Sequence, residues 1–287
     1  MNNPFPRTEV AGVSLSRMII GTNWMVGYSH TGPAADEMIQ NRHSTPETLV
    51  PMFKAYLDNG VDTIMGLFGI EGTAQVYKAI QEAQQKYGKE IKIIDTPIIN
   101  VDDNPQARRE AEAVIKRCKE MGATFCLIHH SSVEQLVDKN QKKIHRLDDY
   151  TKMIRDAGMI PGLSAHMPEI IVYSDLNEYD VQTYIQIYNC MGFLMQVEIE
   201  TVSRIIWEAK KPVMTIKPMA AGRCTPYVGL NFSWSTLRDC DMVTVGCFGE
   251  NEVYEDIEIS RAALEHRYPI IQARKSPNQN QAAFGKK

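Results

Sequence analysis

The sequence predicts an α/β fold, a single-domain (β/α)8 TIM barrel, and three observations support this prediction. Short β-branched or apolar runs alternate with longer segments of helical periodicity, which is typical of parallel βαβ units. Eight such units follow one another along 287 residues, a length that suits one large α/β domain. Several helical segments end at a glycine, where a left-handed C-cap would close the helix before the next strand.

The expected strands are short and apolar. They are Met18 to Gly21, Val61 to Met65, Ile91 to Asp95, Phe125 to His129, Ile160 to Ser164, Val181 to Ile187, Val213 to Ile216 and Val243 to Gly246. The expected helices include Pro46 to Asn59, Glu71 to Tyr87, Pro105 to Met121 and Asp148 to Ala157. Pro51 lies one turn inside the first of these helices, where its missing N–H should kink the helix or delay its start.

Two polar segments depart from the simple repeat. Ser131 to Arg146 is long for a connection between a strand and a helix, so we expect it to carry short structure of its own over the barrel mouth. The barrel is expected to occupy residues 1–271, and the polar C-terminal tail, 272–287, is expected to pack weakly against it.

Composition and charge narrow the classes of protein. Lys and Arg number 31 against 35 Asp and Glu, and no long basic cluster occurs, so nucleic acid and anionic membranes are not expected partners. No apolar run is long enough to span a bilayer, and the first ten residues do not resemble a signal peptide, which favours a cytoplasmic protein. Six cysteines without a Cys-x-x-Cys pair indicate reduced thiols. The sequence leaves the oligomeric state open, with a homo-oligomer as one alternative.

The side chains that can take part in catalysis or binding are expected at the carboxyl ends of the strands, because these ends form the active face of such a barrel. Three of the seven histidines fall on two adjacent strand ends, which is the strongest chemical signal in the sequence. The candidate residues are Asn23, Trp24, Tyr28 and His30 after the first strand, Phe68 after the second, Asp95 at the third, His129 and His130 at the fourth, His166 and Glu169 after the fifth, and Lys217 after the seventh.

The histidines allow two kinds of chemistry. His129, His130 and His166 with Glu169 or Asp95 offer nitrogen and oxygen ligands for a divalent metal ion. Adjacent residues of an extended strand point to opposite faces, so His129 and His130 can share an ion only if the strand has already ended. In the metal-free alternative, His129 and His166 act as general bases, Asp95 is an orienting carboxylate or pairs with Lys217, and Lys217 stabilises an oxyanion. Each histidine could instead be a hydrogen-bonded packing residue.

The loop after the first strand indicates the substrate class. Trp24 offers a stacking face, and Asn23, Tyr28 and His30 offer hydrogen-bonding groups, a combination that suits a sugar or polyol. Phe68 and His130 complete the expected substrate-binding set. The alternative is a packed loop that closes the barrel.

From Val10 to about Glu265 the chain resembles the aldo-keto reductase superfamily, through six stretches whose order and spacing match. They are Val13 to Arg17 leading to Ile20-Gly21-Thr22, Leu57 to Asp62, Cys126 to His129, Gly162 to Ser164, Lys217 to Gly222, and Val245-Gly246 before Glu250 to Ile257.

This resemblance implies a barrel that reduces carbonyl groups with a tetrad of Asp, Tyr, Lys and His, in which the tyrosine donates the proton. In this chain the four positions hold Met65, Phe68, Thr96 or Pro97, and His129. Only His129 matches, and Phe68 has no proton to give, so a reductase reaction would need another acid.

The resemblance also implies a nicotinamide cofactor whose 2′-phosphate is held by basic side chains after the eighth strand. Here that stretch contains Glu250 and Glu252, whose carboxylates would repel the phosphate, so NADPH is not expected. Gly222 and Arg223 could still bind a phosphate or pyrophosphate through backbone N–H groups, and the alternative is a tight turn.

These observations favour a divergent enzyme with the aldo-keto reductase fold and non-redox chemistry. The expected reaction is acid–base or metal-assisted, of the lyase, isomerase or hydrolase class, on a small carbohydrate-like substrate. Two alternatives stay open: an NAD(P)-dependent oxidoreductase that protonates through His129, and a non-catalytic sugar-binding protein.

Overall fold

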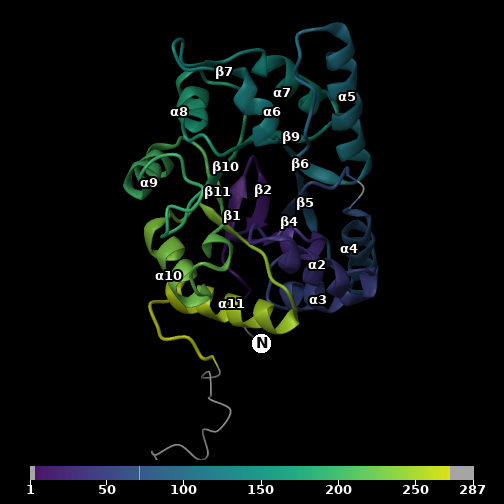
Figure 1. Cartoon of the computed structure of the whole chain (residues 1–287), viewed down its shortest axis with the longest axis vertical. Helices are drawn as coiled ribbons and strands as arrows, with labels where there is room; N and C mark the ends of the chain where they lie inside the picture. The colour runs from purple at the N-terminus through teal and green to yellow at the C-terminus, as the bar shows by residue number, and fades with distance from the viewer. Residues whose placement is uncertain (1–3, 71, 272–287) are drawn as a thin grey trace, which may run out of the picture.

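Eight parallel strands close into a barrel in the computed structural model, which describes residues 4–70 and 72–271 (Figure 1). The predicted (β/α)8 TIM barrel is therefore confirmed. In order around the barrel, the strands are β3 Met18–Gly21, β4 Thr63–Gly66, β5 Lys92–Asp95, β6 Ala123–Ile128, β9 Ile160–Ala165, β10 Tyr184–Ile187, β11 Val213–Ile216 and β12 Met242–Val245. Strand β12 pairs with β3 and closes the ring.

Helices surround the strands in Figure 1 and shield the outer face of the barrel from water. They are α3 Val50–Asp58, α4 Ala74–Tyr87, α5 Pro105–Glu120, α7 Leu147–Asp156, α8 Glu169–Leu176, α9 Ile199–Glu208, α10 Pro226–Thr236 and α11 Glu250–Leu264. The loop after β3 adds α1 Asn23–Val26 and α2 Pro33–Arg42, and the loop after β11 adds the 3-10 turn η3 Ala220–Gly222.

Two of the four predicted helices begin later than predicted. Pro51 is the second residue of α3, which begins only after the separate 3-10 turn η1 Pro46–Thr48, so the delayed start expected from its missing N–H is observed. Helix α4 begins at Ala74, because the Thr73 hydroxyl donates to the carbonyls of Phe68 and Ile70 and holds the preceding turn. The predicted start at Glu71 lies outside the described residues.

A β-hairpin closes the amino-terminal end of the barrel, and it was not predicted from the sequence. Strands β1 Arg7–Val10 and β2 Val13–Ser16 pair antiparallel, and Val10 and Leu15 join the cluster of side chains inside the barrel. Ala11 and Gly12 both have positive φ, as a two-residue hairpin turn of type I′ requires. In the sequence, this hairpin is indicated by Gly12, which lies between two short runs that each have a valine, Val10 or Val13, next to the turn.

The polar segment after β6 has short structure of its own, as predicted. It forms α6 His130–Val133, the 3-10 turn η2 Glu134–Leu136, and the paired strands β7 Val137–Asp138 and β8 Lys143–Ile144. The Glu134 carboxylate accepts hydrogen bonds from the backbone N–H groups of His166 and Met167, at 2.7 and 2.9 Å. This contact fixes the segment to the carboxyl end of β9.

Other predictions concern the whole chain. Within residues 4–70 and 72–271, no helix combines the length and the apolar character needed to cross a membrane. All six cysteines fall in this part and are unpaired, as predicted. The predicted polar tail, 272–287, lies outside the described residues.

The hairpin should contribute to stability through Leu15, which is fully buried. Leu15→Ala should lower the free energy of unfolding by about 2–5 kcal/mol, because it removes apolar contacts and leaves a cavity inside the barrel. Urea denaturation would measure this loss. Glu9→Ala, an exposed position of the same hairpin, is the control and should stay within about 0.5 kcal/mol of the wild type. Equal stability of the two variants would show that the hairpin does not seal the core.

Candidate active site

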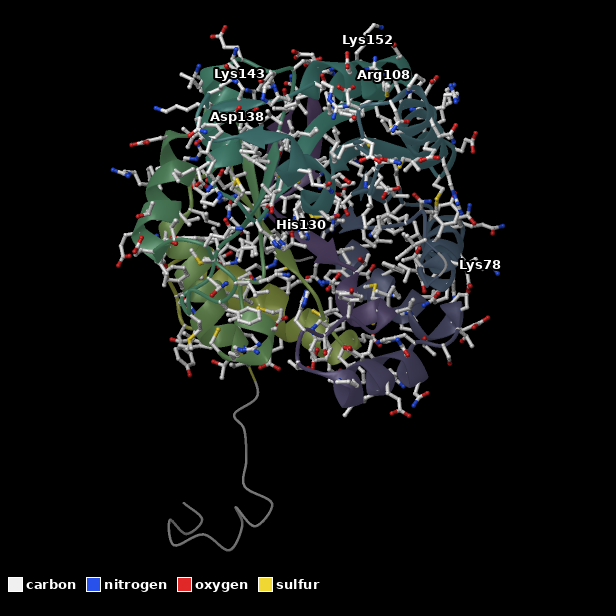
Figure 2. The ribbon with its side chains drawn as sticks, turned by 45° about the horizontal axis from the view of Figure 1, so that its top comes forward. Lys78, Arg108, His130, Asp138, Lys143 and Lys152 are labelled. Carbon is white, nitrogen blue, oxygen red and sulfur yellow. The ribbon has the colours of Figure 1, made fainter. Side chains whose placement is uncertain are left out.

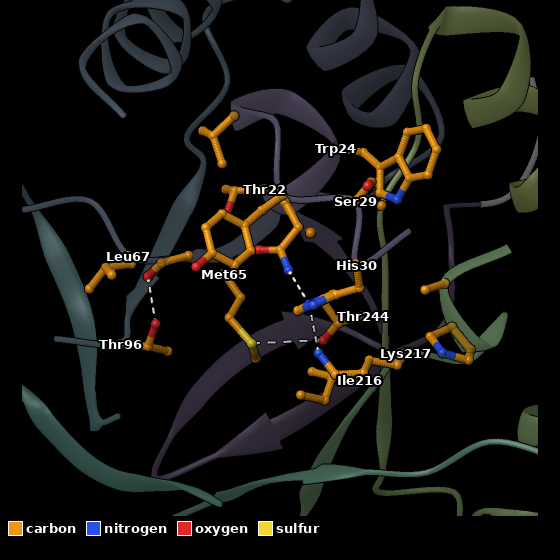
Figure 3. A pocket seen from close by; sticks show the side chains of 18 of the residues that line it. Thr22, Trp24, Ser29, His30, Met65, Leu67, Thr96, Ile216, Lys217 and Thr244 are labelled. Carbon is orange, nitrogen blue, oxygen red and sulfur yellow. Dashed lines mark hydrogen bonds between the residues drawn. The ribbon is translucent and has the colours of Figure 1, made fainter. Parts of the chain in front are cut away.

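A cavity of about 710 Å³ opens at the carboxyl ends of the strands. Its volume suits a small ligand. Met65, Ile185 and Ile216 supply apolar surface to it, and polar side chains come from the loops above (Figure 3). Of the predicted site residues, those that line it are Asn23, Trp24, Tyr28, His30, His129, His130, His166, Lys217 and Gly222.

Three imidazole rings lie together at this mouth. Strand β6 ends at Ile128, so His129 and His130 are not in an extended strand and their rings lie side by side, with centroids 4.2 Å apart. The His166 ring stacks on that of His130 at 3.7 Å and 18°. In Figure 2, His130 lies near the middle of the molecule, whereas charged residues such as Lys78 and Lys152 lie at the periphery.

His129 is held in one tautomer. Its Nδ1 accepts a hydrogen bond from the backbone N–H of Ser131 at 3.3 Å and lies 2.8 Å from the Ser131 hydroxyl. A backbone N–H can only donate, so the proton of the neutral ring is on Nε2. Desolvation, with the charges of His130 and Lys217, lowers the pKa of His129 to about 4. The ring is therefore a neutral hydrogen-bond donor at pH 7.

The other two imidazoles are also neutral near pH 7. Desolvation, followed by the charges of His130 and Lys217, lowers the pKa of His166 to about 3. Desolvation likewise lowers the pKa of His130, although the nearby Glu134 opposes this shift. The cluster therefore offers unprotonated rings that can accept a proton.

Lys217 follows β11 and brings the nearest cationic group to the imidazoles. Its Nζ donates to His30 Nε2 at 3.0 Å, and Asn23 Nδ2 lies 3.3 Å from the same nitrogen (Figure 3). Desolvation lowers the pKa of Lys217 to about 8. Its backbone has a φ of 61°, a left-handed conformation that is uncommon for residues other than glycine.

The four predicted metal ligands do not form a metal site. The lone pairs of an imidazole lie in the ring plane, so the stacked rings of His130 and His166 do not direct their nitrogens at one point. Glu169 instead forms an ion pair with Lys139 at 2.7 Å and does not line the cavity. Among the described residues, no three His, Cys, Asp or Glu side chains are arranged to hold a metal ion.

Asp95 and Phe68 lie outside the cavity, so their predicted roles there are wrong. Side chains alternate along β5, and because Ile94 points into the barrel, Asp95 points towards the helices. Its carboxylate accepts from the Phe68 backbone N–H at 3.2 Å, and burial raises its pKa. The Phe68 ring is buried in the core between strands and helices.

The predicted sugar-binding loop does line the cavity. The Trp24 ring meets Phe248 edge-on at 6.2 Å, and the Tyr28 ring meets His30 edge-on at 5.7 Å. The Ser29 backbone N–H donates to the Asp36 carboxylate at 2.7 Å, which anchors the loop to α2. The aromatic faces are thus held in place, and sugar binding itself stays a prediction.

The two residues of the predicted phosphate site, Gly222 and Arg223, do not face the same space. Gly222 lines the cavity, but Arg223 does not. The Arg223 guanidinium lies 4.0 Å over the Phe193 ring and donates to the Ala220 carbonyl at 3.2 Å. This geometry favours the alternative of a tight turn.

Several cavity residues were not proposed from the sequence. Thr96, Ser164 and Thr244 lie in or directly after strands β5, β9 and β12. Their position near the carboxyl ends of these strands is the sequence feature that could have identified them. A second group forms an acidic wall from α11: Glu252, Glu255 and Asp256. Burial raises the pKa of Asp256 to about 7.

The fold has known counterparts, although the sequence matches no protein-family model and no curated protein. A Pseudomonas aeruginosa protein assigned to the aldo-keto reductases superposes with a TM-score of 0.62 at 13% identity, over 90% of this chain and 95% of the other. The chain has the aldo-keto reductase fold. A glycerol dehydrogenase from Gluconobacter oxydans has a TM-score of 0.57 at 12% identity, over 94% and 99% of the two chains. An aldose reductase from Giardia lamblia has a TM-score of 0.51 at 11% identity, over 98% and 92%.

The lowered pKa of His166 has a consequence for stability. The unfolded chain takes up a proton at this ring near pH 6.5, but the folded chain does so only near pH 3, so stability falls as the pH drops through this interval. As the pH is lowered from 6.5 to about 4, the melting temperature of His166→Asn should fall less than that of the wild type. His266→Asn, at an exposed histidine, is the control and should follow the wild type. Identical pH profiles for all three proteins would contradict the desolvation of His166.

Proposed function

We propose that this chain is an enzyme that performs non-redox acid–base chemistry on a small carbohydrate-like substrate, as a lyase, isomerase or hydrolase. One observation carries the proposal: a desolvated lysine and three neutral imidazoles share one cavity at the barrel mouth. Unprotonated bases beside a cation suit proton abstraction next to a carbonyl group, because the cation stabilises the oxyanion that forms.

The imidazoles divide the proton transfers between them. His129 carries its proton on Nε2 and can donate a hydrogen bond to a substrate oxygen. His130 and His166 are candidates for the base because both are unprotonated at neutral pH; His130 is the stronger base, since Glu134 opposes the fall in its pKa, whereas the pKa of His166 is about 3. Lys217 lies close enough to lower the pKa of all three rings, so its charge also acts on a substrate placed between them.

A sugar or polyol is the substrate class that best suits the side chains lining the cavity. Trp24 offers a ring face, and Asn23, His30 and Ser164 add polar atoms within the same cavity. Two proteins of similar fold are a glycerol dehydrogenase and an aldose reductase, whose names refer to a polyol and to sugars. Carbohydrates combine apolar ring faces with many hydroxyl groups, which this mixture of side chains matches.

Two features argue against NADPH-dependent reduction. Phe68 stands at the position of the expected proton donor, and its ring has no exchangeable proton and is buried in the core. The first turn of α11 contains Glu250 and Glu252, and Glu252 already accepts from the Phe248 backbone N–H at 2.7 Å. A 2′-phosphate placed at this helix end would meet carboxylates rather than basic groups.

The purified protein should therefore show no NADPH-dependent reduction of simple aldehydes. Loss of absorbance from NADPH in the presence of glyceraldehyde would measure this activity, with an active aldo-keto reductase as the positive control. Robust turnover would overturn the non-redox assignment and favour a reductase with an atypical acid.

Sugars, keto-sugars and polyols should raise the melting temperature, and steroids and acyl chains should not. A ligand at roughly 100 times its dissociation constant stabilises the fold by about 2.7 kcal/mol, which a thermal-shift screen detects. Trp24→Ala should abolish the shift because the stacking face is lost. Trp207→Ala is the matched control, since Trp207 is 58% exposed on α9 and does not line the cavity. Stabilisation by apolar compounds alone would contradict the proposed substrate class.

A further inference from the structure

Lys217 is a cation without an anionic partner. Among residues 4–70 and 72–271, no carboxylate lies within 4 Å of its ammonium, and the hydrogen bond at Nζ goes to His30 Nε2 at 3.0 Å. Lys211, six residues earlier, provides the contrast, because its ammonium forms an ion pair with Asp175 at 3.1 Å. Lys217 is half-buried, and a desolvated lysine without an anionic partner often has a lowered pKa that serves chemistry.

The surroundings of Lys217 increase the fraction of its neutral amine. Ile216, Pro218 and Met219 line the cavity beside it, and four imidazoles, including that of His30, share the space. This desolvation lowers the pKa of Lys217 to about 8. At pH 7 the neutral amine is then roughly 300-fold more abundant than in an ordinary lysine. A neutral amine in an apolar pocket is a nucleophile towards carbonyl carbon.

We propose that Lys217 forms a Schiff base with the carbonyl carbon of a small aldose or ketose bound at the barrel mouth. The inference rests on the proposed function and deepens it, since it assigns a covalent role to a residue otherwise treated as a fixed charge. It also narrows the reaction to one in which a bond next to the carbonyl carbon breaks, which is lyase or isomerase chemistry rather than hydrolysis.

The step balances without an oxidant or a reductant. The Lys217 nitrogen attacks the carbonyl carbon, and the electron pair of the C=O π bond moves to oxygen, which gains a proton and gives a carbinolamine. The nitrogen then forms a double bond to carbon as the hydroxyl group takes up a proton and leaves as water. The resulting iminium accepts the electron pair of a neighbouring C–H or C–C bond. Hydrolysis later returns the amine.

The groups around Lys217 can manage the protons of this step. His30 Nε2 accepts the hydrogen bond from Nζ and so lies where the ammonium proton must leave. His129 presents an N–H at Nε2 that can hydrogen-bond the departing oxygen. The iminium carries the same positive charge as the ammonium it replaces, so the nearby rings of His130 and His166 stay unprotonated and able to take the carbon-bound proton.

Reductive trapping tests the proposal directly on the full chain. The protein is incubated with dihydroxyacetone and sodium cyanoborohydride, and peptide mass spectrometry locates the product. We expect Lys217 to gain the mass of one dihydroxyacetone less one oxygen atom, at least about tenfold faster than Lys78, an exposed lysine on α4 (Figure 2). The rate of modification at Lys217 should rise with pH through about 8. Modification of Lys78 at an equal rate, or none at Lys217, would overturn the proposal.

A variant separates the covalent role from the charge. Lys217→Arg keeps a cation but cannot form an imine, and Lys78→Arg is the matched control. In D2O, the wild type and Lys78→Arg should exchange the carbon-bound hydrogen of dihydroxyacetone for deuterium, as proton NMR would record, and Lys217→Arg should lose both trapping and exchange. If Lys217→Arg exchanges at the wild-type rate, the Schiff base is excluded while acid–base chemistry stands. If the wild type neither exchanges hydrogen nor is stabilised by sugars, the proposed function fails as well.

Discussion

Closure of the barrel depends on a buried ion pair beneath its last strand. Asp241 is fully buried, and its carboxylate accepts from the Arg238 guanidinium at 2.7 Å and from the Val213 backbone N–H at 2.9 Å. Arg238 also donates to the Lys211 carbonyl, and Arg17 donates to the Asp241 carbonyl at 3.0 Å. The network thereby joins the starts of β11, β12 and β3. A buried pair is tolerated because nearly every lone pair and proton has a partner.

Closure of the barrel has an electrostatic consequence at the carboxyl ends of the strands. It brings Lys217, which follows β11, close enough to the imidazoles that follow β6 and β9 to lower their pKa values. Desolvation lowers the pKa of Lys217 and of the rings, and the charge of Lys217 lowers the pKa of the rings further. Bases that would be partly protonated in water are therefore free at neutral pH, at a cost to stability in acid.

Polar residues behind the strands brace the barrel rather than serve the cavity. Asp95 holds the Phe68 N–H from the helix side of β5. His43 is buried in the same way, with its Nε2 2.9 Å from the Phe248 carbonyl after β12. The same residue types therefore support loops at one place and face the mouth at another.

Local patterns in the sequence were sufficient to predict the barrel and most of the residues at its mouth. Strand and helix periods are local properties, and parallel strands bring all their carboxyl ends to one face, so the order of residues along the chain already groups His129, His166 and Lys217. The end of β6 at Ile128, the outward direction of Asp95 and the lack of an anionic partner for Lys217 emerged only from the folded chain. Strand register and desolvation are set by residues distant in the chain, and no local pattern encodes them.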